Sequence, residues 1–521
     1  MGGLVTILGI GGLLGGAAAA ILKDGELVAA VEEAKLLRQR SHWGAGEMPA
    51  RAIATCLDLA AAKPADVDTV AVVRPLPSTD EFHLQLRAQF PNSRIAVVEH
   101  HLAHAASAYC CSPFDEATVL TLDRGSDFRC AGRWRAQGTQ LTLDYEQYAP
   151  DSIGDIYCRV TELLGFTANA DEHKVQWLSV SGDDRFRGLF TEILNPSDSG
   201  VRIDRGFFST ERVRDGGFGP RFFDRLGLKE GAALPDSLRP HIASGIQGAM
   251  EDAVIRLAGD GTNLCLAGGL GLNALLVSAL ETRSGFKNVF VQPAAGNAGT
   301  AIGAVLQGRR AKLNTMSLGP SFAAAEIKQV VENCKLRFQS LVTTDEVIDA
   351  AVAQLSDSKI VAWMHGRMEF GARALGNRSI LASPLDPYSS ENLNAFIKHR
   401  EPFRKFAASV PAELAAEYFE VGPNARWLAT VGRVRTGHRE RFAAATLAGD
   451  LIRVHTVDRE ENPLYWKLLP AAGKATGLPV LFNTSFNLFG EPLVCTPRDA
   501  VRSFCSSGID ALFIGNFFLQ K

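Results

Sequence analysis

Three histidines and an acidic residue form the sharpest chemical signal in the sequence. His100, His101 and His104 directly follow the apolar run IAVV, and the segment AHAASAYC behind them has a helical pattern. On a helix, His100 and His104 project from one face and can bind one metal ion. Asp123, at the end of the predicted strand VLTLD, is the best third ligand, with Asp127 close behind it. The alternative is a polar helix start whose histidines make only hydrogen bonds.

A second set of residues is cationic and lies in the last third of the chain. Two of its arginines stand among glycines in EFGARALGNRS, and another lies in a predicted strand. The set comprises Arg373, Arg378, Lys398, Arg400, Arg404, Lys405 and Arg453. Guanidinium groups bind phosphate bidentately and lysine supplies a point charge, so converging cations suit a substrate with several phosphates. The alternative is a solvated charged surface, which the small and apolar neighbours of the arginines disfavour.

Two polar turns complete the candidate residues. The segment NTSFN, from Asn483 to Asn487, follows the apolar run PVLF, and polar groups at the carboxyl end of a strand can contact a ligand. The turn GGLGLN, from Gly268 to Asn273, lies between a predicted strand and helix and suits contact with a nucleotide. A simple turn uses the same residue types. The sequence contains no G-x-S-x-G, H-E-x-x-H or Cys/His zinc motif, so hydrolase and zincin functions lack support.

Composition limits the class of protein. With 521 residues, 54 Lys+Arg and 57 Asp+Glu, the net charge of −3 gives no bulk attraction for nucleic acid or an anionic membrane. The stretch Gly2 to Leu22 has no charge, but it lacks a basic start and runs into the turn Lys23-Asp24-Gly25. It therefore predicts a strand, a Gly loop and a hairpin rather than a membrane segment. Nine scattered cysteines favour reduced thiols, so we expect a cytoplasmic protein. From the net charge and the N-terminal pattern we expect no nucleic-acid or membrane partner.

The elements that must position these residues belong to the α/β class. Strand, Gly loop and hairpin patterns occur twice, around residues 4–32 and 117–148, with helical patterns around 50–62 and 80–90. Residues 239–308 alternate helix and strand, and short strands mix with helices at 344–355, 389–398 and 497–506. We place the main domain boundary near residue 340. A duplicated actin-like ATPase fold shows such a repeat, although other α/β folds can show it too.

The motifs taken together resemble those of the O-carbamoyltransferase family, which includes the nodulation-factor, aminoglycoside and cephalosporin carbamoyltransferases. They occur in order along almost the whole chain as VEHHLAHAASAY, VLTLD, EHKV, LAGGLGLN, GNAGTAIGA, GRMEFGARALGNRSILASP, FIKHREPFRKFAASVP and LFNTSFNLFGEPLVCTPRDA. The resemblance implies a duplicated actin-like (ASKHA) domain over residues 1–340, similar to the tRNA threonylcarbamoyl transferase. It also implies a YrdC-like α/β domain over residues 341–521 that forms carbamoyl-adenylate.

The family's chemistry then supplies roles for the residues. The C-terminal domain would join carbamoyl phosphate and ATP, with Mg²⁺, into carbamoyl-adenylate. The N-terminal domain, with a divalent metal expected to be Fe²⁺, would transfer the carbamoyl group to a hydroxyl of a small-molecule acceptor. The implied catalytic residues are His100, His104, Asp123 and Lys174, of which the first three bind the metal. The implied nucleotide and carbamoyl-phosphate ligands are Arg373, Lys398, Arg404, Arg453, Asn483 and Ser485. The implied carbamoyl-adenylate ligands are Gly268, Gly269, Asn273 and Asn297. A homodimer is compatible with this scheme.

The chain departs from the family pattern only in the acceptor half. The departures are Gly15-Gly16 for the usual His-Asp, Arg124 and Trp177 for glycines, and Asn297 for an aspartate. Asp127 and Glu172 are candidates to replace the missing base. Two other functions stay open, namely an actin-like-fold kinase or ATPase and a non-catalytic nucleotide-binding homologue with a decayed acceptor site. A role in tRNA modification is disfavoured by the slightly acidic charge and the lack of a basic stripe.

Overall fold

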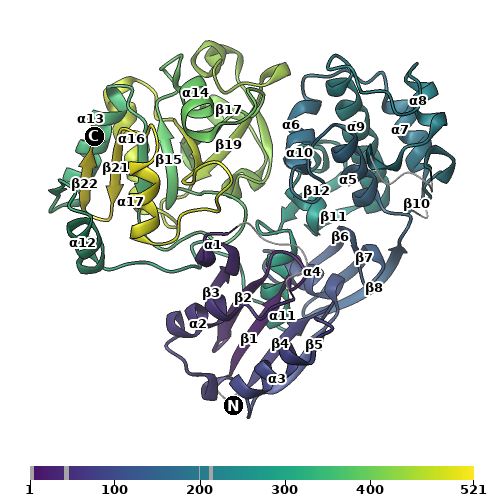
Figure 1. Cartoon of the computed structure of the whole chain (residues 1–521), viewed down its shortest axis with the longest axis horizontal. Coiled ribbons are helices and arrows are strands. Elements are labelled where there is room, and N and C mark those ends of the chain that lie inside the picture. The colour runs from purple at the N-terminus through teal and green to yellow at the C-terminus, as the bar shows by residue number, and fades with distance from the viewer. Residues whose placement is uncertain (1–4, 40–45, 199, 210–214) are drawn as a thin grey trace. The chain divides into compact units, whose positions relative to one another are not determined.

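The computed structural model describes residues 5–39, 46–198, 200–209 and 215–521 (Figure 1). The chain divides into two compact units, one formed by residues 1–99 and 297–521 and the other by residues 100–296. The fold is mixed α/β with several sheets, as the sequence predicts. The boundary expected near residue 340 falls within the first unit, and the assignment of domains 1–340 and 341–521 stays a prediction.

The uncharged N-terminal run forms the centre of a five-stranded sheet. Its strands are β1 (Thr6–Gly11), β2 (Ala18–Lys23), β3 (Glu26–Glu32), β4 (Thr69–Val73) and β5 (Arg94–Val98), in the order β3-β2-β1-β4-β5. Asp24 and Gly25 both have positive φ, as a tight hairpin turn requires. The helices α1 (Glu33–Leu37), α2 (Ala50–Leu59), α3 (Asp80–Gln89) and α11 (Thr300–Val305) belong to the same unit. The predicted strand, loop and hairpin are thus confirmed, and no described helix is both long and apolar enough to cross a membrane.

The unit 100–296 contains a second sheet with the same topology. Its strands are β6 (Glu116–Ser126), β7 (Arg129–Gln137), β8 (Gln140–Tyr148), β11 (Asp260–Ala267) and β12 (Gly285–Val291), in the order β12-β11-β6-β7-β8. In both sheets three antiparallel strands are followed by two that run parallel to the first. The helices are α4 (His100–Tyr109), α5 (Ile153–Leu163), α6 (Glu172–Ser179), α7 (Arg187–Leu194), α8 (Pro220–Arg225), α9 (Arg239–Ala258) and α10 (Ala274–Arg283). A short ribbon pairs β9 (Pro196–Ser197) with β10 (Gly200–Val201).

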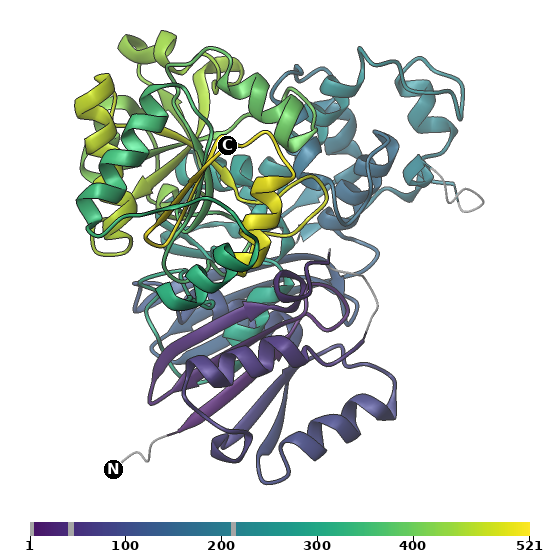
Figure 2. The ribbon, with the colours of Figure 1, turned by 60° about the vertical axis from the view of Figure 1, so that its left-hand side comes forward.

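The C-terminal part of the chain forms a ten-stranded mixed sheet (Figure 2). In spatial order its strands are β13 (Gln339–Ser340), β22 (Phe517–Gln520), β21 (Ala511–Ile514), β14 (Val361–Met364), β15 (Arg378–Ala382), β20 (Leu481–Ser485), β16 (Ala407–Pro411), β19 (Leu451–Val457), β18 (Val431–Val434) and β17 (Phe419–Glu420). The helices are α12 (Ala324–Asn333), α13 (Thr344–Ser356), α14 (Ser389–Asn392), α15 (Ala415–Tyr418), α16 (Pro463–Thr476) and α17 (Pro497–Cys505). The helix predicted at 389–398 is present, but its second half is the π-helix η6 (Leu393–Lys398).

Both faces of the ten-stranded sheet pack against apolar cores, and one of them also carries polar groups. The first face packs into a large core with members such as Ala362, Ile380, Phe482, Ala408 and Val454. On the other face, Asn483 of β20 pairs with Ala407 of β16, which pairs with Arg453 of β19. Residues in register point to the same side of a sheet, so Asn483 and Arg453 flank a small alanine on one face. The central strands thus place the polar residues that the sequence singles out side by side.

Candidate active site

Helix α4 and strand β6 bring His100, His104 and Asp123 together inside the unit 100–296. His100 Nε2 lies 3.0 Å from Asp123 Oδ2, His104 Nε2 lies 3.6 Å from the same oxygen, and the two Nε2 atoms are 3.1 Å apart. One ligand atom from each residue lies within 4.8 Å of the others, and this is the one such group among the described residues. Two imidazoles and a carboxylate are a suitable donor set for a first-row divalent metal. The residues therefore fit the expected metal, with Asp123 rather than Asp127 as the acidic member.

The middle histidine, His101, faces away from this group. Its Nδ1 lies 2.9 Å from Thr121 Oγ1 on β6, and its Nε2 lies 3.0 Å from the carbonyl oxygen of Arg129 on β7. Burial, together with the neighbouring His100 and His104, lowers the pKa of His101 to about 3, so this imidazole is neutral. Its two bonds tie the helix to both strands and thereby fix the distance between the helix-borne histidines and Asp123.

The electrostatics of Asp123 favour its ionised form. Burial would raise the pKa of this carboxyl group, but hydrogen bonds and charge from His100 and His104 outweigh burial and hold the pKa well below its ordinary value. The backbone N–H of Arg124 also donates to Asp123 Oδ1, at 2.8 Å. The carboxylate is therefore available as a charged ligand.

The glycine-rich turn after β11 packs against Asp123. A Cβ atom on Gly268, whose φ is +94°, would lie 2.1 Å from the carbonyl oxygen of Leu122, and one on Gly269 would lie 3.2 Å from Asp123 Oδ1. Asn273 ends the short helix η4 (Gly269–Leu272) and caps α10. Its Oδ1 accepts from the N–H groups of the first turn of α10, and its Nδ2 donates to Gln247 Oε1 at 2.9 Å. The structure thus places the two glycines beside the metal ligands and gives Asn273 a capping role, while nucleotide binding by the turn stays a prediction.

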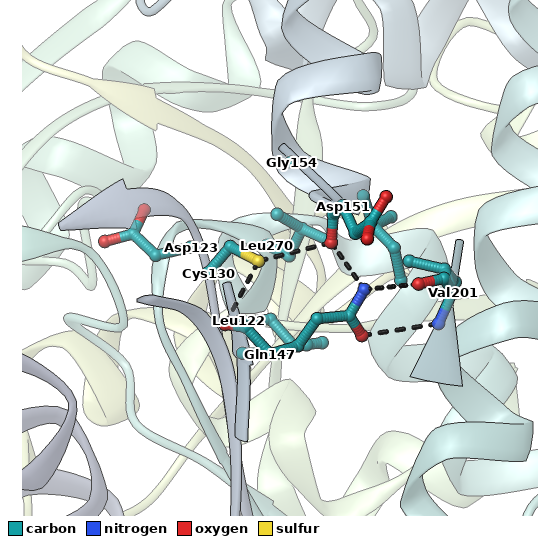
Figure 3. A pocket seen from close by; sticks show the side chains of 10 residues that line it. Leu122, Asp123, Cys130, Gln147, Asp151, Gly154, Val201 and Leu270 are labelled. Carbon is teal, nitrogen blue, oxygen red and sulfur yellow. Dashed lines mark hydrogen bonds between the residues drawn. The ribbon is translucent and has the colours of Figure 1, made fainter. Parts of the chain in front are cut away.

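A small cavity lies behind Asp123 (Figure 3). It measures about 10 Å³, which is room for about one water molecule. Gln147 donates to the carbonyl oxygens of Val201 and Asp151 and accepts from the N–H of Val201, closing one wall. The carboxylate of Asp123 points away from this wall in Figure 3. The cavity is too small for a substrate.

The positions of two further predicted residues, Lys174 and Asn297, do not decide whether they take part in the reaction. Lys174 of α6 forms an ion pair with Asp171 at 3.2 Å and stands over the Phe166 ring, so its catalytic role stays a prediction. Asn297 begins the turn η5 (Asn297–Gly299), which belongs to the unit formed by residues 1–99 and 297–521. A Cβ atom added to Gly16 would lie 3.7 Å from the Cβ atom of Asn297. Two of the departures from the family pattern are therefore neighbours.

Five basic side chains of the C-terminal part lie close enough to perturb one another. Burial lowers the pKa of Lys398 and Arg453 well below their ordinary values, and the charges of Arg400 and Arg404 lower both further. Arg373 acts on Arg453 in the same way. Burial also lowers the pKa of Arg373 to about 10 and that of Arg400 to about 9. The structure thus brings together five members of the cationic set predicted from the sequence, Arg400 included, and phosphate binding by them stays a prediction.

The NTSFN segment holds the lysine of this cluster. Lys398, only 5% exposed at the end of η6, donates to the carbonyl oxygen of Ser485 and to the carbonyl and Oδ1 oxygens of Asn487 at 2.9 and 2.7 Å. Asn483 donates to the carbonyl oxygen of Ala374 at 3.1 Å, while its buried Oδ1 has no hydrogen-bond partner among the described residues. Asn487, the last residue of the predicted NTSFN segment, thus contacts the lysine of the cationic set.

The arginines of EFGARALGNRS have different surroundings. Arg378 is fully buried, and its guanidinium donates to the carbonyl oxygens of His365 and Asn377 at 2.9 and 3.0 Å. Glu369 closes the loop, because its Oε1 accepts from three backbone N–H groups, those of Leu375, Asn377 and Arg378. Arg373 lies at the middle of this closed loop. Arg378 therefore supports the loop, while ligand binding by Arg373 stays a prediction.

Comparisons with known proteins identify the family of this chain. Residues 80–306 match the family model described as carbamoyltransferase N-terminus, and residues 352–521 match carbamoyltransferase C-terminus. The nodulation protein NolNO of Sinorhizobium fredii is 31% identical over 554 residues, covering 97% of this chain and 78% of that protein. The chain belongs to the carbamoyltransferase family. As a carbamoyltransferase it is a transferase enzyme, and its fold is that of a mixed α/β protein.

Other similar proteins extend the comparison. An uncharacterised protein of Synechocystis sp. is 33% identical to this carbamoyltransferase over 602 residues, covering 99% of this chain and 97% of that protein. Among solved structures, HypF of T. kodakarensis is 13% identical with a TM-score of 0.33, covering 58% of this chain and 47% of that chain. YeaZ of Pseudomonas aeruginosa is 15% identical with a TM-score of 0.21, covering 28% of this chain and 68% of that chain.

Proposed function

We propose that this carbamoyltransferase is an ATP-dependent O-carbamoyltransferase with two sites. Residues 341–521 would convert carbamoyl phosphate, ATP and one water molecule into carbamoyl-adenylate, phosphate and pyrophosphate: water would cleave carbamoyl phosphate to carbamate and phosphate, and a carbamate oxygen would displace pyrophosphate from ATP. Residues 1–340 would then transfer the carbamoyl group to a hydroxyl of a small natural-product or sugar-like acceptor. The observation that carries the proposal is the gathering of five basic side chains, in which the charges of Arg400 and Arg404 lower the pKa of both Lys398 and Arg453, and Arg373 acts on Arg453 in the same way. A ligand rich in phosphate, such as ATP with Mg²⁺, would offset this repulsion.

The basic and amide side chains near the polar sheet face would have different roles in adenylate formation. The guanidinium groups of Arg373 and Arg453 would pair with phosphate oxygens and stabilise the charge on the departing pyrophosphate. The buried Oδ1 of Asn483, which lacks a partner among the described residues, can accept a hydrogen bond from the carbamoyl NH₂ group. An ester or acid without that NH₂ group would leave this oxygen unsatisfied, which favours carbamoyl over acyl donors.

The transfer half rests on the group of His100, His104 and Asp123. A divalent metal held there, Fe²⁺ by the family resemblance, would supply Lewis acidity toward the carbamoyl donor. His101 keeps the two ligand imidazoles at the right distance from Asp123, and the Gly268-Gly269 turn leaves space for a group next to the carboxylate. The shared topology of the two five-stranded sheets supports the duplicated actin-like assignment of this half. Because carbamoyl-adenylate hydrolyses readily, forming and using it within one chain is an advantage.

Pyrophosphate release tests the proposal. Purified protein with ATP and Mg²⁺ is expected to release pyrophosphate only when carbamoyl phosphate is added. Arg373→Ala should lower this rate about a hundredfold or more, because a charge that stabilises the leaving group is lost. Arg498→Ala is the matched control, since Arg498 is exposed on α17 and should leave the rate unchanged.

Two outcomes would contradict the proposal. If carbamoyl phosphate does not stimulate pyrophosphate release, the chain does not form carbamoyl-adenylate. If instead labelled γ-phosphate moves from ATP to a small molecule, the kinase alternative is the better description.

A further inference from the structure

We infer that the short helix α1, with its flanking residues Glu32 and Arg38, positions the anion-binding cations of the C-terminal part. This inference rests on the proposed function, because it concerns how the polyphosphate ligands of that site are held. Helix α1 follows the third strand of the N-terminal sheet. Glu33 accepts from backbone N–H groups of α2, whereas Lys35 and Arg38 bond to two loops of residues 369–499. Both segments belong to one compact unit.

Lys35 is the first of these contacts. It is only 7% exposed, and its ammonium group donates to the carbonyl oxygens of Glu369 and Gly371 at 2.9 and 2.8 Å. The third partner is Glu32 Oε2, at 2.9 Å. The ammonium group thus has two hydrogen bonds and one countercharge, which compensate its burial. Both hydrogen-bond acceptors are backbone atoms of the loop that leads to Arg373.

Glu32 completes a clamp on the same loop. Its Oε1 accepts from the backbone N–H of Gly371 at 2.9 Å, while Lys35 binds the carbonyl oxygen of that glycine. Both backbone polar groups of Gly371 are therefore held by α1 and its flanking residue Glu32, at a position whose φ is +99°. Arg373 follows two positions later, so a shift of Gly371 changes where its guanidinium lies.

Arg38 holds the second loop. Its Nη1 donates to the carbonyl oxygens of Pro492 and Leu493 at 2.8 and 2.7 Å, and its Nη2 pairs with Glu491 Oε2 at 2.8 Å. The carbonyl oxygen of Glu491 in turn accepts from Asn487 Nδ2 at 2.8 Å, and Asn487 binds the ammonium group of Lys398. Arg38 therefore supports Lys398 through two intermediate residues.

The chemistry of these contacts favours positioning over simple packing. A helix of five residues has little stability of its own, and an apolar side chain at position 35 would pack with less desolvation. A buried lysine bonded to two backbone carbonyl oxygens and paired with Glu32 instead fixes the loop geometry, which the site of Arg373 needs. The N-terminal segment thus acts as a support for the adenylate-forming site, although none of its residues need touch the substrate.

The test uses the full-length protein with inorganic pyrophosphate as the probe. Lys35→Met and Arg38→Met are each expected to weaken pyrophosphate binding, measured by calorimetry, by about tenfold or more, because displaced loops misplace the cations. Arg38→Lys keeps a cation beside Glu491 and should restore part of the affinity. Lys23→Met is the matched control, because Lys23 of the same sheet binds only the carbonyl oxygen of Ala60 and should change affinity less than about twofold.

Backbone amide exchange provides a readout independent of the proposed function. In Lys35→Met the amides of residues 371–378 should exchange faster than in wild type and in Lys23→Met. Wild-type protein that fails to bind pyrophosphate would defeat the proposed function, and unchanged exchange at 371–378 would defeat the inference about α1. Folded Lys35→Met or Arg38→Met protein that binds pyrophosphate as wild type does would also overturn the inference. If Lys35→Met fails to fold, the comparison of Arg38→Met with Arg38→Lys decides: equal, wild-type-like affinities overturn it.

Discussion

The carboxylate of Asp123 contacts two histidines that lie one turn apart on helix α4. His100 and His104 both direct Nε2 toward the same carboxylate oxygen, and His101 between them points into the sheet. A metal ion at this place would have two ligands from one helix and one from a strand. Its affinity therefore depends on each ligand and on the helix-to-strand distance.

The first prediction concerns metal binding by these residues. His104→Ala should weaken the binding of Co²⁺, followed through its visible absorption, by about a hundredfold or more, because two protein ligands remain out of three. Carbamoyl-phosphate-dependent pyrophosphate release should stay at the wild-type rate, since it belongs to the other site. His83→Ala on α3 serves as the control and should bind Co²⁺ like wild type. Equal Co²⁺ affinity in the two variants would show that the trio does not bind metal.

Sequence reasoning was strongest at this scale where the geometry is local. The spacing of His100 and His104 is enough to place them on one face, because helical periodicity depends only on the residues between. The same reasoning could not separate Arg373 from Arg378, since both stand among small residues in one motif. Which of them binds backbone carbonyls depends on packing against distant segments, such as the carbonyl oxygens of His365 and Gly366.

At the scale of elements, the turn between β11 and α10 sets how closely the second sheet can surround Asp123. Gly268 is in a left-handed conformation and has no room for a side chain against the carbonyl of Leu122. The capping of α10 by Asn273 holds the other end of the turn. The turn therefore acts as a rigid neighbour of the metal ligands.

The second prediction follows from this turn. Gly268→Ala should push β6 outward at Leu122, costing about 2–4 kcal/mol of the free energy of unfolding and weakening Co²⁺ binding at least tenfold. Chemical denaturation and Co²⁺ titration check both effects. Gly188→Ala on α7 is the control, because a Cβ there meets nothing within 4 Å and the backbone is helical. A Gly268→Ala protein as stable as the control would show that the turn can relax.

The element pattern was predicted well where hydrophobic periodicity is strong and less well where the backbone deviates. The hairpins at the start of both five-stranded sheets and the helices at 344–355 and 497–506 are present. In contrast, the run predicted as a strand over 427–434 forms β18 only from Val431, because Leu428 has φ of +54° and ends the short helix η8 (Pro423–Trp427). The π-helical turn ending at Lys398 also has no signature in periodicity, since it arises where the ammonium group must reach Asn487.

The third prediction concerns the stability of the whole molecule, which the cluster of basic side chains in the C-terminal part should lower. Burial, with Arg373, Arg400 and Arg404, holds the pKa of Arg453 well below its ordinary value, so the folded state disfavours its charged form. At neutral pH, Arg453→Gln should therefore raise the free energy of unfolding of the ligand-free protein by about 1 kcal/mol. ATP should raise the Tm of wild type but not of this variant, because bound phosphate compensates the charges only while they are present. Melting curves with and without ATP, with Arg498→Gln as control, check both effects.

A lower unfolding free energy in Arg453→Gln together with an undiminished ATP effect would contradict this electrostatic account. In that case Arg453 would serve the fold rather than the ligand. A parallel fall in both quantities would mean that the variant loses structure, and the control would then separate this from a general effect of removing an arginine.

The larger architecture was predicted only in part. The repeated strand, loop and hairpin pattern indicated a duplication, and the two five-stranded sheets do share one topology. The strand order of the ten-stranded sheet was beyond sequence reasoning, because neighbours such as β14 and β21 lie far apart along the chain. The sequence also did not predict that residues 1–99 and 297–521 form one compact unit. The contacts of Lys35 and Arg38 within this unit are hydrogen bonds to backbone atoms, which leave no pattern in the sequence.

Those same bonds have a consequence for biosynthesis. Lys35 and Arg38 bond to residues that are 334 and 454 positions further along the chain. A chain emerging from the ribosome presents the N-terminal sheet long before those partners exist, and contacts of such sequence separation form slowly. The N-terminal hairpins therefore complete their packing among the last steps of folding, and until then their apolar strands are the part of the nascent chain most exposed to aggregation and most in need of a chaperone.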